Sequence, residues 1–528
     1  MTDLLLTGGL VVDGTGAAPR SADVLVRDGL VAAIGPGAAA SGEVTVRDVS
    51  GLLVTPGFVD IHTHSDLTLL SAPQAPSKTA QGVTTEVVGN CGLGAAPLAE
   101  GSDVAAIRSA VSYLDLDPAV RWSWSDTAGY LAAVDAARCS LNVATLTGHL
   151  PLRAGTTGFA DRPSTVAETD RMAGLLADSF AAGSLGLSTG LVYAPLCYAD
   201  EAELLALGEV VAAHDRVFTW HVRNYDDDLL PSVAQALRVA ERTGCRTQIS
   251  HLAAVGRRNW GSVAKALDLV DDALSRGLAV GVNAYPYLHG NALLSQLLPA
   301  WAQDGGPSEL RARLRDPRAR QRIVQAWADR PTTWADITVS WVPRNHETER
   351  WLGRTIAEIA DTTGRDGDDV ALDLLADLGT AVLMVAGGRS EDDLRTVLAH
   401  PASVVASDGL SLDPGGVTGA GTPHPRSYGC FPRFLARYAG HSGPELARAV
   451  RKCTGAPADL IGLAGRGTLH EGGPADLVVL DLDTLADRAT FTEPQLHPEG
   501  IDLVLVAGQP VIEAGRHTGA RPGAVLHR

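Results

Sequence analysis

Between residues 57 and about 409, short apolar runs rich in β-branched residues alternate with longer segments of helical period. This alternation is typical of repeated βα units, whose strands lie parallel in one sheet. Eight of the runs have the length and composition of strands: 59–64, 83–90, 141–147, 184–189, 217–221, 247–251, 278–284 and 403–408. Because eight parallel strands can close into a cylinder, we predict an α/β fold built on a (β/α)8 barrel of the TIM type.

The two ends of the chain have a different pattern, namely short β segments separated by turns. We predict that residues 1–56 and 466–528 form one small β-sandwich domain beside a barrel of residues 57–465. More than a hundred residues separate the seventh and eighth predicted strands, which is too long for a single crossover. We therefore predict an insertion at about 288–345 that covers the mouth of the barrel.

Charge and composition exclude several classes of protein. The 528 residues include 43 Lys and Arg against 61 Asp and Glu, a formal net charge of −18, so we expect no nucleic-acid partner. No stretch approaches about 20 uninterrupted apolar residues, so we expect no membrane partner either. The first residues lack the basic region and cleavage site of an export signal, and the six cysteines form no CxxC pair. We therefore expect a cytoplasmic protein; the sequence indicates no oligomeric state.

Four histidines lie at the ends of predicted barrel strands, where this architecture places its catalytic groups. His62 and His64 are two residues apart on the first strand, so their side chains point to the same side and can bind one Zn²⁺. His221 and His251 end two consecutive strands. Either of these alone is more commonly a core histidine, but together with the first pair they favour a metal centre.

A metal centre made only of neutral imidazoles leaves divalent cations poorly neutralised, so we expect an anionic ligand as well. Cys91 ends the second strand and can supply a thiolate, which Zn²⁺ favours, although a lone cysteine is more often inert packing. Asp408 ends the eighth strand, just before Gly409. A carboxylate there can accept a proton from water and return it to a leaving nitrogen; the alternative is a simple turn cap.

Together these motifs resemble the amidohydrolase superfamily and, within it, the N-acyl-D-amino-acid deacylase (D-aminoacylase) family. The resemblance covers nearly the whole chain and depends on residues 8–14, 54–60, 82–85, 89–92, 188–191 with Tyr193, 285–287, 407–409, 424–429 and 473–478. It implies a tightly bound zinc ion, held by Cys91, His221 and His251. It also implies a weaker or optional second metal at His62 and His64, with Asp408 as the catalytic acid and base.

The same resemblance implies the residues that face the substrate. Arg426, in the His-Pro-Arg segment, and a tyrosine would contact the substrate; the candidate tyrosines are Tyr193, Tyr285 and Tyr287. A tyrosine or His289 would also stabilise the oxyanion that forms when the amide carbonyl is attacked.

The chain departs from the family pattern at three positions near these motifs. Ala253 stands where the family usually has a lysine that helps to bind the substrate carboxylate, Tyr225 replaces a glutamate, and Asn283 replaces an aspartate. Losing one cationic partner of a bound carboxylate costs about 1.5–3 kcal/mol of binding free energy. We therefore expect the metal chemistry of the family with a divergent substrate pocket.

The resemblance thus implies a zinc-dependent hydrolase that cleaves the amide bond of a small molecule such as an N-acyl amino acid. The alternative enzyme is a cyclic amide or imide hydrolase, or a biosynthetic tailoring enzyme with a non-amino-acid substrate. A catalytically inactive binding or scaffold protein is disfavoured, because all five candidate ligands and Asp408 are present.

Overall fold

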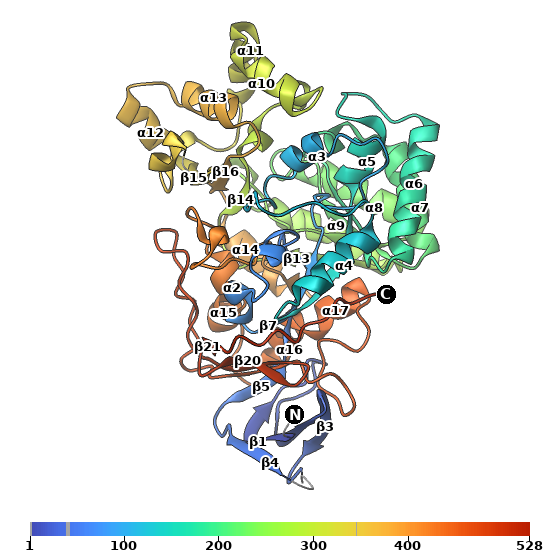
Figure 1. The fold of residues 1–528 in the computed structure, drawn as a ribbon, viewed down its shortest axis with the longest axis vertical. Helices are drawn as coiled ribbons and strands as arrows, with labels where there is room; N and C mark the ends of the chain where they lie inside the picture. The colour runs from blue at the N-terminus through green and yellow to red at the C-terminus, as the bar shows by residue number, and fades with distance from the viewer. Residues whose placement is uncertain (1–2, 39–42, 345) are drawn as a thin grey trace.

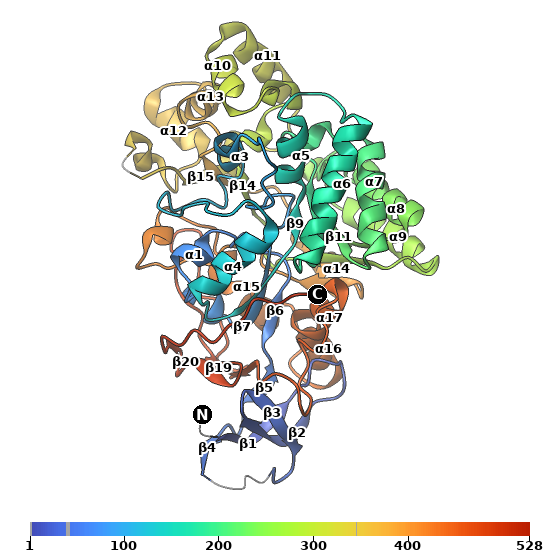
Figure 2. The same cartoon turned by 45° about the vertical axis from the view of Figure 1, so that its right-hand side comes forward.

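The computed structural model describes residues 3–38, 43–344 and 346–528 (Figures 1 and 2). Its centre is a set of parallel strands, one for each of the eight predicted runs. They are β6 (Phe58–Asp60), β7 (Val83–Val88), β8 (Asn142–Thr145) continued by β9 (Thr147–Gly148), β10 (Gly186–Gly190), β11 (Val217–His221), β12 (Arg246–Ile249), β13 (Val280–Ala284) and β17 (Ser403–Val405).

The strands close into a ring. β6, β7 and β8 pair in that order, and β9 through β13 continue to β17 with every pair parallel. The first and last strands meet where the amide of Asp408 donates to the carbonyl of His62 and the amide of His64 donates to that of Gly409, both at 2.8 Å. The predicted (β/α)8 barrel is therefore confirmed.

Helices cover the outside of the ring, as the bank of green helices on the right of Figure 1 shows. Helix α8 illustrates why they form: Val233, Ala236, Leu237 and Ala240 recur every three or four residues and are buried, and Gly244 ends the helix at φ 74°. The helices outside the insertion are α1 (Thr68–Ser71), α2 (Pro76–Thr79), α3 (Val104–Ala110), α4 (Thr127–Ala137), α5 (His149–Thr157), α6 (Val166–Ala181), α7 (Glu201–Ala213), α8 (Leu229–Thr243), α9 (Ser262–Ser275), α14 (Glu391–Ala399), α15 (Arg426–Arg437), α16 (Gly443–Cys453) and α17 (Gly455–Ile461).

Both chain ends contribute to one nine-stranded sheet at the bottom of Figure 1. The N-terminal strands are β1 (Asp3–Val11), β2 (Arg20–Arg27), β3 (Leu30–Gly35), β4 (Val44–Asp48) and β5 (Leu53–Pro56); the C-terminal ones are β18 (Leu477–Leu480), β19 (Ile501–Val506), β20 (Gln509–Glu513) and β21 (Arg516–His517). The two sets join where β18 pairs antiparallel with β5, so the sheet is continuous. Residues 1–2 and 39–42 of the predicted segment 1–56 lie outside the described residues.

Most of the segment between β13 and β17, up to residue 386, forms a separate unit, seen at the top of Figures 1 and 2. Its elements are β14 (Gly290–Leu293), α10 (Pro307–Arg315), α11 (Pro317–Trp327), β15 (Ile337–Trp341), α12 (Ile356–Thr363), α13 (Gly367–Leu378) and β16 (Leu383–Ala386). β16 pairs antiparallel with both β14 and β15, and the unit has its own apolar core. The unit therefore extends past the predicted end near residue 345, because its central strand comes last; residue 345 itself is not among the described residues.

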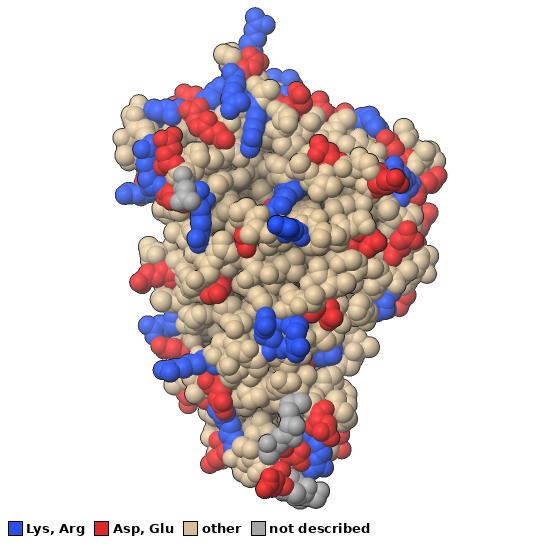
Figure 3. Space-filling view, in the orientation of Figure 1, with Lys and Arg blue, Asp and Glu red and all other residues tan. Residues whose placement is uncertain are grey.

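Acidic and basic side chains are interspersed over the face in Figure 3. None of the helices in the described part of the chain has the length and apolarity needed to traverse a lipid bilayer.

A buried ion cluster connects the first strands of the barrel to the segment before Asp408. Lys78 Nζ lies 2.8 Å from Asp60 Oδ2 and 3.1 Å from Glu86 Oε1, and all three side chains are fully buried. Asp60 also accepts a hydrogen bond from the backbone amide of Ser407 at 2.9 Å. Lys78 thus neutralises two carboxylates that have no access to water.

Replacing Lys78 with Met is expected to lower the free energy of unfolding by about 3–5 kcal/mol, because two buried carboxylates then lack their cation. Urea unfolding followed by circular dichroism measures this loss. Lys265→Met, on the exposed face of α9, is the matched control and should unfold like the unmodified protein. Equal unfolding midpoints for the two variants would contradict a stabilising role of the cluster.

Candidate active site

Four side chains converge at the carboxyl ends of the barrel strands. The ligand atoms of His62, Cys91, His251 and Asp408 all lie within 4.8 Å of one another. Cys91 Sγ is 3.2 Å from His62 Nε2 and 3.4 Å from His251 Nε2, and His62 Nε2 is 3.4 Å from Asp408 Oδ1. The four residues follow β6, β7, β12 and β17, so the ring brings together groups that are far apart in sequence.

The backbone turns sharply at three of these residues. Cys91, His251 and Asp408 have φ of 55°, 36° and 52°, a left-handed conformation that residues other than glycine adopt at a cost of about 1–3 kcal/mol each. At Gly89, two residues before Cys91, φ is 78° and a Cβ atom would lie 2.1 Å from the carbonyl oxygen of Leu146. Surrounding packing therefore holds these strand ends in conformations that such residues otherwise avoid.

Two further predicted ligands, His64 and His221, border this group. His64 Nε2 lies 3.0 Å from Asp408 Oδ1, while its Nδ1 is buried without a partner among the described residues. The ring of His221 is centred 4.6 Å from that of His251, and neither of its nitrogens has a hydrogen-bond partner in the described part of the chain. A buried imidazole with two unsatisfied nitrogens is costly unless a further group binds it, which fits a metal ligand.

Burial keeps these imidazoles neutral. It lowers the pKa of His62 and of His221 to about 3 and that of His251 well below its ordinary value, so each ring keeps one unprotonated nitrogen. Burial also raises the pKa of the Cys91 thiol well above its usual range. A divalent cation reverses this effect, because a coordinating thiol loses its proton.

Asp408 is paired with a guanidinium from α15. Arg426 Nη1 donates to Asp408 Oδ2 at 2.7 Å, and Nη2 donates to the hydroxyl of Tyr113 at 3.1 Å. Burial alone would raise the pKa of Asp408, but Arg426 and the neighbouring imidazoles outweigh it and hold the pKa well below its ordinary value. The carboxylate is therefore ionised, with Oδ1 facing the two histidines of the first strand.

The group opens into a cavity of about 650 Å³ between the barrel and the insertion. His64, Cys91, His221, His251 and Asp408 line its floor. The insertion supplies a largely apolar wall of Ala292, Leu297, Leu298, Trp327, Ile337 and Met384. The cavity thus joins a polar, ligand-rich floor to a wall suited to an apolar substituent.

The structure brings only some of the predicted substrate residues to this cavity. Tyr193 and Tyr285 line it. Arg426 is fully buried behind Asp408, and the Tyr287 hydroxyl donates to Asp487 at 2.9 Å. The ring of His289 packs against Phe491, with centroids 4.3 Å apart, and His289 is not among the lining residues.

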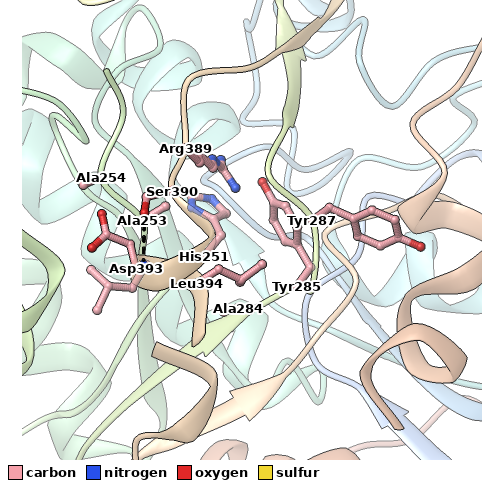
Figure 4. Close-up of a pocket in the computed structure, with 11 residues that line it drawn as sticks. His251, Ala253, Ala254, Ala284, Tyr285, Tyr287, Arg389, Ser390, Asp393 and Leu394 are labelled. Atoms are coloured by element: carbon pink, nitrogen blue, oxygen red, sulfur yellow. Dashed lines mark hydrogen bonds between the residues drawn. The ribbon is translucent and has the colours of Figure 1, made fainter. Parts of the chain in front are cut away.

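Sequence reasoning missed two cavity residues, Arg389 and Tyr113. Arg389 follows Gly387 and Gly388 at the end of the insertion, and Figure 4 shows its guanidinium close to His251 and Tyr285. No carboxylate pairs with it among the residues that the structure describes. The adjoining glycines were its only sequence signal, whereas Tyr113 lies in a connection without a motif.

The three departures from the family pattern also border the site. Ala253 lines a small void of about 20 Å³ next to Arg389 (Figure 4). The Tyr225 ring lies 5.0 Å from that of His221, and its hydroxyl donates to the carbonyl of Ser250 at 3.1 Å. Asn283 contacts both His62 and the backbone of His251.

The fold and the residues at the strand ends define a class of protein. Its members are barrel enzymes that gather imidazole, thiol and carboxylate groups at the carboxyl ends of their strands. Residues 45–512 match the model of the amidohydrolase family. N-acyl-D-glutamate deacylase of Alcaligenes xylosoxydans xylosoxydans is 36% identical over 527 residues, covering 100% of this chain and 96% of the relative. D-aminoacylase of the same organism is 34% identical, with coverages of 100% and 98%.

A solved structure supports the same relationship. The N-acyl-D-glutamate deacylase of Bordetella bronchiseptica, complexed with zinc and a phosphonate inhibitor, is 35% identical, with a TM-score of 0.83 and full coverage of both chains. The chain therefore belongs to the amidohydrolase family, as the sequence motifs predicted. It is a hydrolase of carbon–nitrogen bonds other than peptide bonds.

Arg426→Gln is expected to move the acidic limb of the pH–rate profile (kcat/KM) to higher pH. The Asp408 carboxylate has a depressed pKa and stays ionised until the pH falls through that pKa. Removing the Arg426 guanidinium raises the pKa of Asp408, so on acidification the carboxylate is protonated, and activity is lost, at a higher pH. Arg437→Gln, on the exposed end of the same helix, is the control. An acidic limb that did not move in Arg426→Gln would show that the guanidinium does not set this pKa.

Proposed function

We propose that the protein is a zinc-dependent hydrolase of the amide bond of N-acyl amino acids, similar in reaction to D-aminoacylase. The observation that carries this proposal is the convergence of a thiol, imidazoles and an ionised carboxylate within 4.8 Å at the floor of a cavity that also holds Arg389. The relatives named above are N-acyl-D-glutamate deacylases and a D-aminoacylase, and one of them was solved with zinc.

The donor set suits zinc. Cys91, His221 and His251 would hold the tight ion, and the two unsatisfied nitrogens of His221 support this assignment. His62 and His64 would hold the second, weaker position. The chemistry that zinc supplies when bound is polarisation of the amide carbonyl and activation of the attacking water.

Asp408 would carry the proton between the attacking water and the leaving nitrogen. Its carboxylate is ionised and faces the cavity floor, which is the state that a general base needs before the reaction. After accepting the proton, the same group is the acid that protonates the departing amine. Arg426 would act as a positioning residue, because its Nη1 donates to Oδ2 of Asp408 and leaves Oδ1 toward the site.

Arg389 would bind the carboxylate of the substrate. Its guanidinium lies beside Tyr285 at the cavity, 5.0 Å from the centre of the ring. The family usually has a second cation, a lysine, at position 253. Because Ala253 supplies no charge, Arg389 would bind the substrate carboxylate without it. The apolar wall of the insertion is suited to an acyl chain or an apolar side chain of the substrate.

A reducing compartment such as the cytoplasm suits this function. All six cysteines are free thiols, and Cys91 must stay unoxidised to bind zinc.

Cys91→Ala is expected to lose its tightly bound zinc and most of its hydrolytic activity. Zinc content is measured by atomic emission, and turnover is measured on a panel of N-acyl-D-amino acids, N-acyl-L-amino acids, and cyclic amides and imides. Cys453→Ala, a buried cysteine in α16, is the matched control and should keep both zinc and activity. Full zinc content and rate in Cys91→Ala would refute the ligand assignment, and cleavage of cyclic amides or imides alone would favour that alternative enzyme.

Arg389→Met is expected to lower kcat/KM for an N-acyl amino acid about 10- to 150-fold, the equivalent of losing one charge-assisted hydrogen bond. The effect should vanish for the matching N-acyl amine, which has no carboxylate. Arg257→Met, an exposed arginine outside the cavity, is the control. Equal losses on both substrates would show that Arg389 does not recognise the carboxylate.

A further inference from the structure

Asn283 lies between two residues of the candidate metal centre. Its Oδ1 accepts a hydrogen bond from the backbone amide of His251 at 2.6 Å, and its Nδ2 lies 3.3 Å from His62 Nδ1. Asn283 is in β13 and its side chain is buried, so water does not compete for these contacts. Each of its two polar atoms therefore has one protein partner.

The orientation of this side-chain amide follows from chemistry alone. A backbone N–H can only donate, so the atom of Asn283 that faces His251 must be the oxygen. The NH₂ group must then face His62, and an NH₂ group can only donate. His62 Nδ1 is consequently the acceptor in this contact.

A neutral imidazole that accepts through Nδ1 carries its proton on Nε2. In His62 this proton points at two acceptors, Cys91 Sγ at 3.2 Å and Asp408 Oδ1 at 3.4 Å. Both ring nitrogens of His62 therefore have hydrogen-bond partners when the proton is on Nε2. In this tautomer Nε2 has no free lone pair. That lone pair is the one that His62 would need to coordinate a metal within this group.

We propose that Asn283 holds His62 in its Nε2–H tautomer and thereby weakens the metal position at His62 and His64. This inference rests on the proposed function, because it concerns the second of the two positions proposed there. Asn283 is thus a positioning residue that biases the protein toward a single tightly bound zinc ion.

The hydrogen bonds of His64 also indicate that the second metal position is weak. When a histidine binds a metal, its other ring nitrogen almost always donates to a carboxylate, a carbonyl or water. His64 Nδ1 has no acceptor among the described residues, and its Nε2 is engaged with Asp408 at 3.0 Å. For His62 the required acceptor is replaced by the NH₂ group of Asn283. Within residues 3–38, 43–344 and 346–528, neither histidine of the pair therefore has a protein acceptor that supports metal binding.

An aspartate at position 283 would accept from His62 Nδ1 instead of donating to it. One carboxylate oxygen can accept from the His251 amide and the other from His62 Nδ1–H, which leaves Nε2 free to bind a metal. Because changes in such supporting partners alter metal affinity about 10- to 100-fold, Asn283→Asp should strengthen the second site by that factor.

The experiment uses the full-length enzyme after removal of metal with a chelator. Zinc is titrated back against a chromophoric competitor, and cobalt is titrated separately so that its visible absorption reports the ligands. We expect the unmodified protein to bind one ion tightly and a second one weakly, and Asn283→Asp to raise only the weaker affinity, about 10- to 100-fold. Imidazole ¹⁵N shifts, assigned with His62→Asn, should show the Nε2–H tautomer only in the unmodified protein.

Asn224→Asp is the matched control for charge. Asn224 also lines the cavity, and its Oδ1 accepts from the backbone amides of Asp226 and Asp228, contacts that a carboxylate retains. This variant should leave both metal affinities unchanged.

Two results would overturn the inference while leaving the proposed function intact. One is tight binding of two ions by the unmodified protein; the other is an equal rise of both affinities in Asn283→Asp, which would reflect added charge alone. Failure of the unmodified protein to bind any zinc would instead refute the proposed function, and this inference with it.

Discussion

The site depends on the closure of the barrel between its first and last strands. Two backbone hydrogen bonds join the His62–His64 segment to Asp408 and Gly409, residues that are more than three hundred positions apart in the chain. Because the strands on either side are held by continuous ladders, the position of each strand end is fixed relative to the others. The strained conformations at Cys91, His251 and Asp408 can persist only in such a rigid ring.

The electrostatics of the floor follow from its isolation from water. Burial favours neutral imidazoles and a protonated thiol, and only the carboxylate of Asp408 retains its charge, because Arg426 is buried beside it. The result is a set of donor atoms with one fixed anion, held by the protein before any ligand binds. Preorganisation of this kind is how an active site avoids reorganising polar groups during the reaction.

The sequence predicts the barrel and the strand-end residues because both are local signals. Each strand is a short apolar run, and each candidate ligand stands at the end of such a run. The sequence could not predict the contribution of Arg389 and Tyr113 to the cavity, or the role of Asn283. These depend on how segments that are distant in the chain pack together. The insertion was predicted too short for the same reason: β16 becomes its central strand only through pairing with β14 and β15.

The insertion has its own apolar core and its own sheet, yet it supplies one complete wall of the cavity and ends at Arg389. Substitutions within this wall can change the size of the bound group without altering the strand ends. Such a division lets selectivity diverge while the chemistry is inherited unchanged, so two descendants of this enzyme can cleave the same kind of bond in very different compounds.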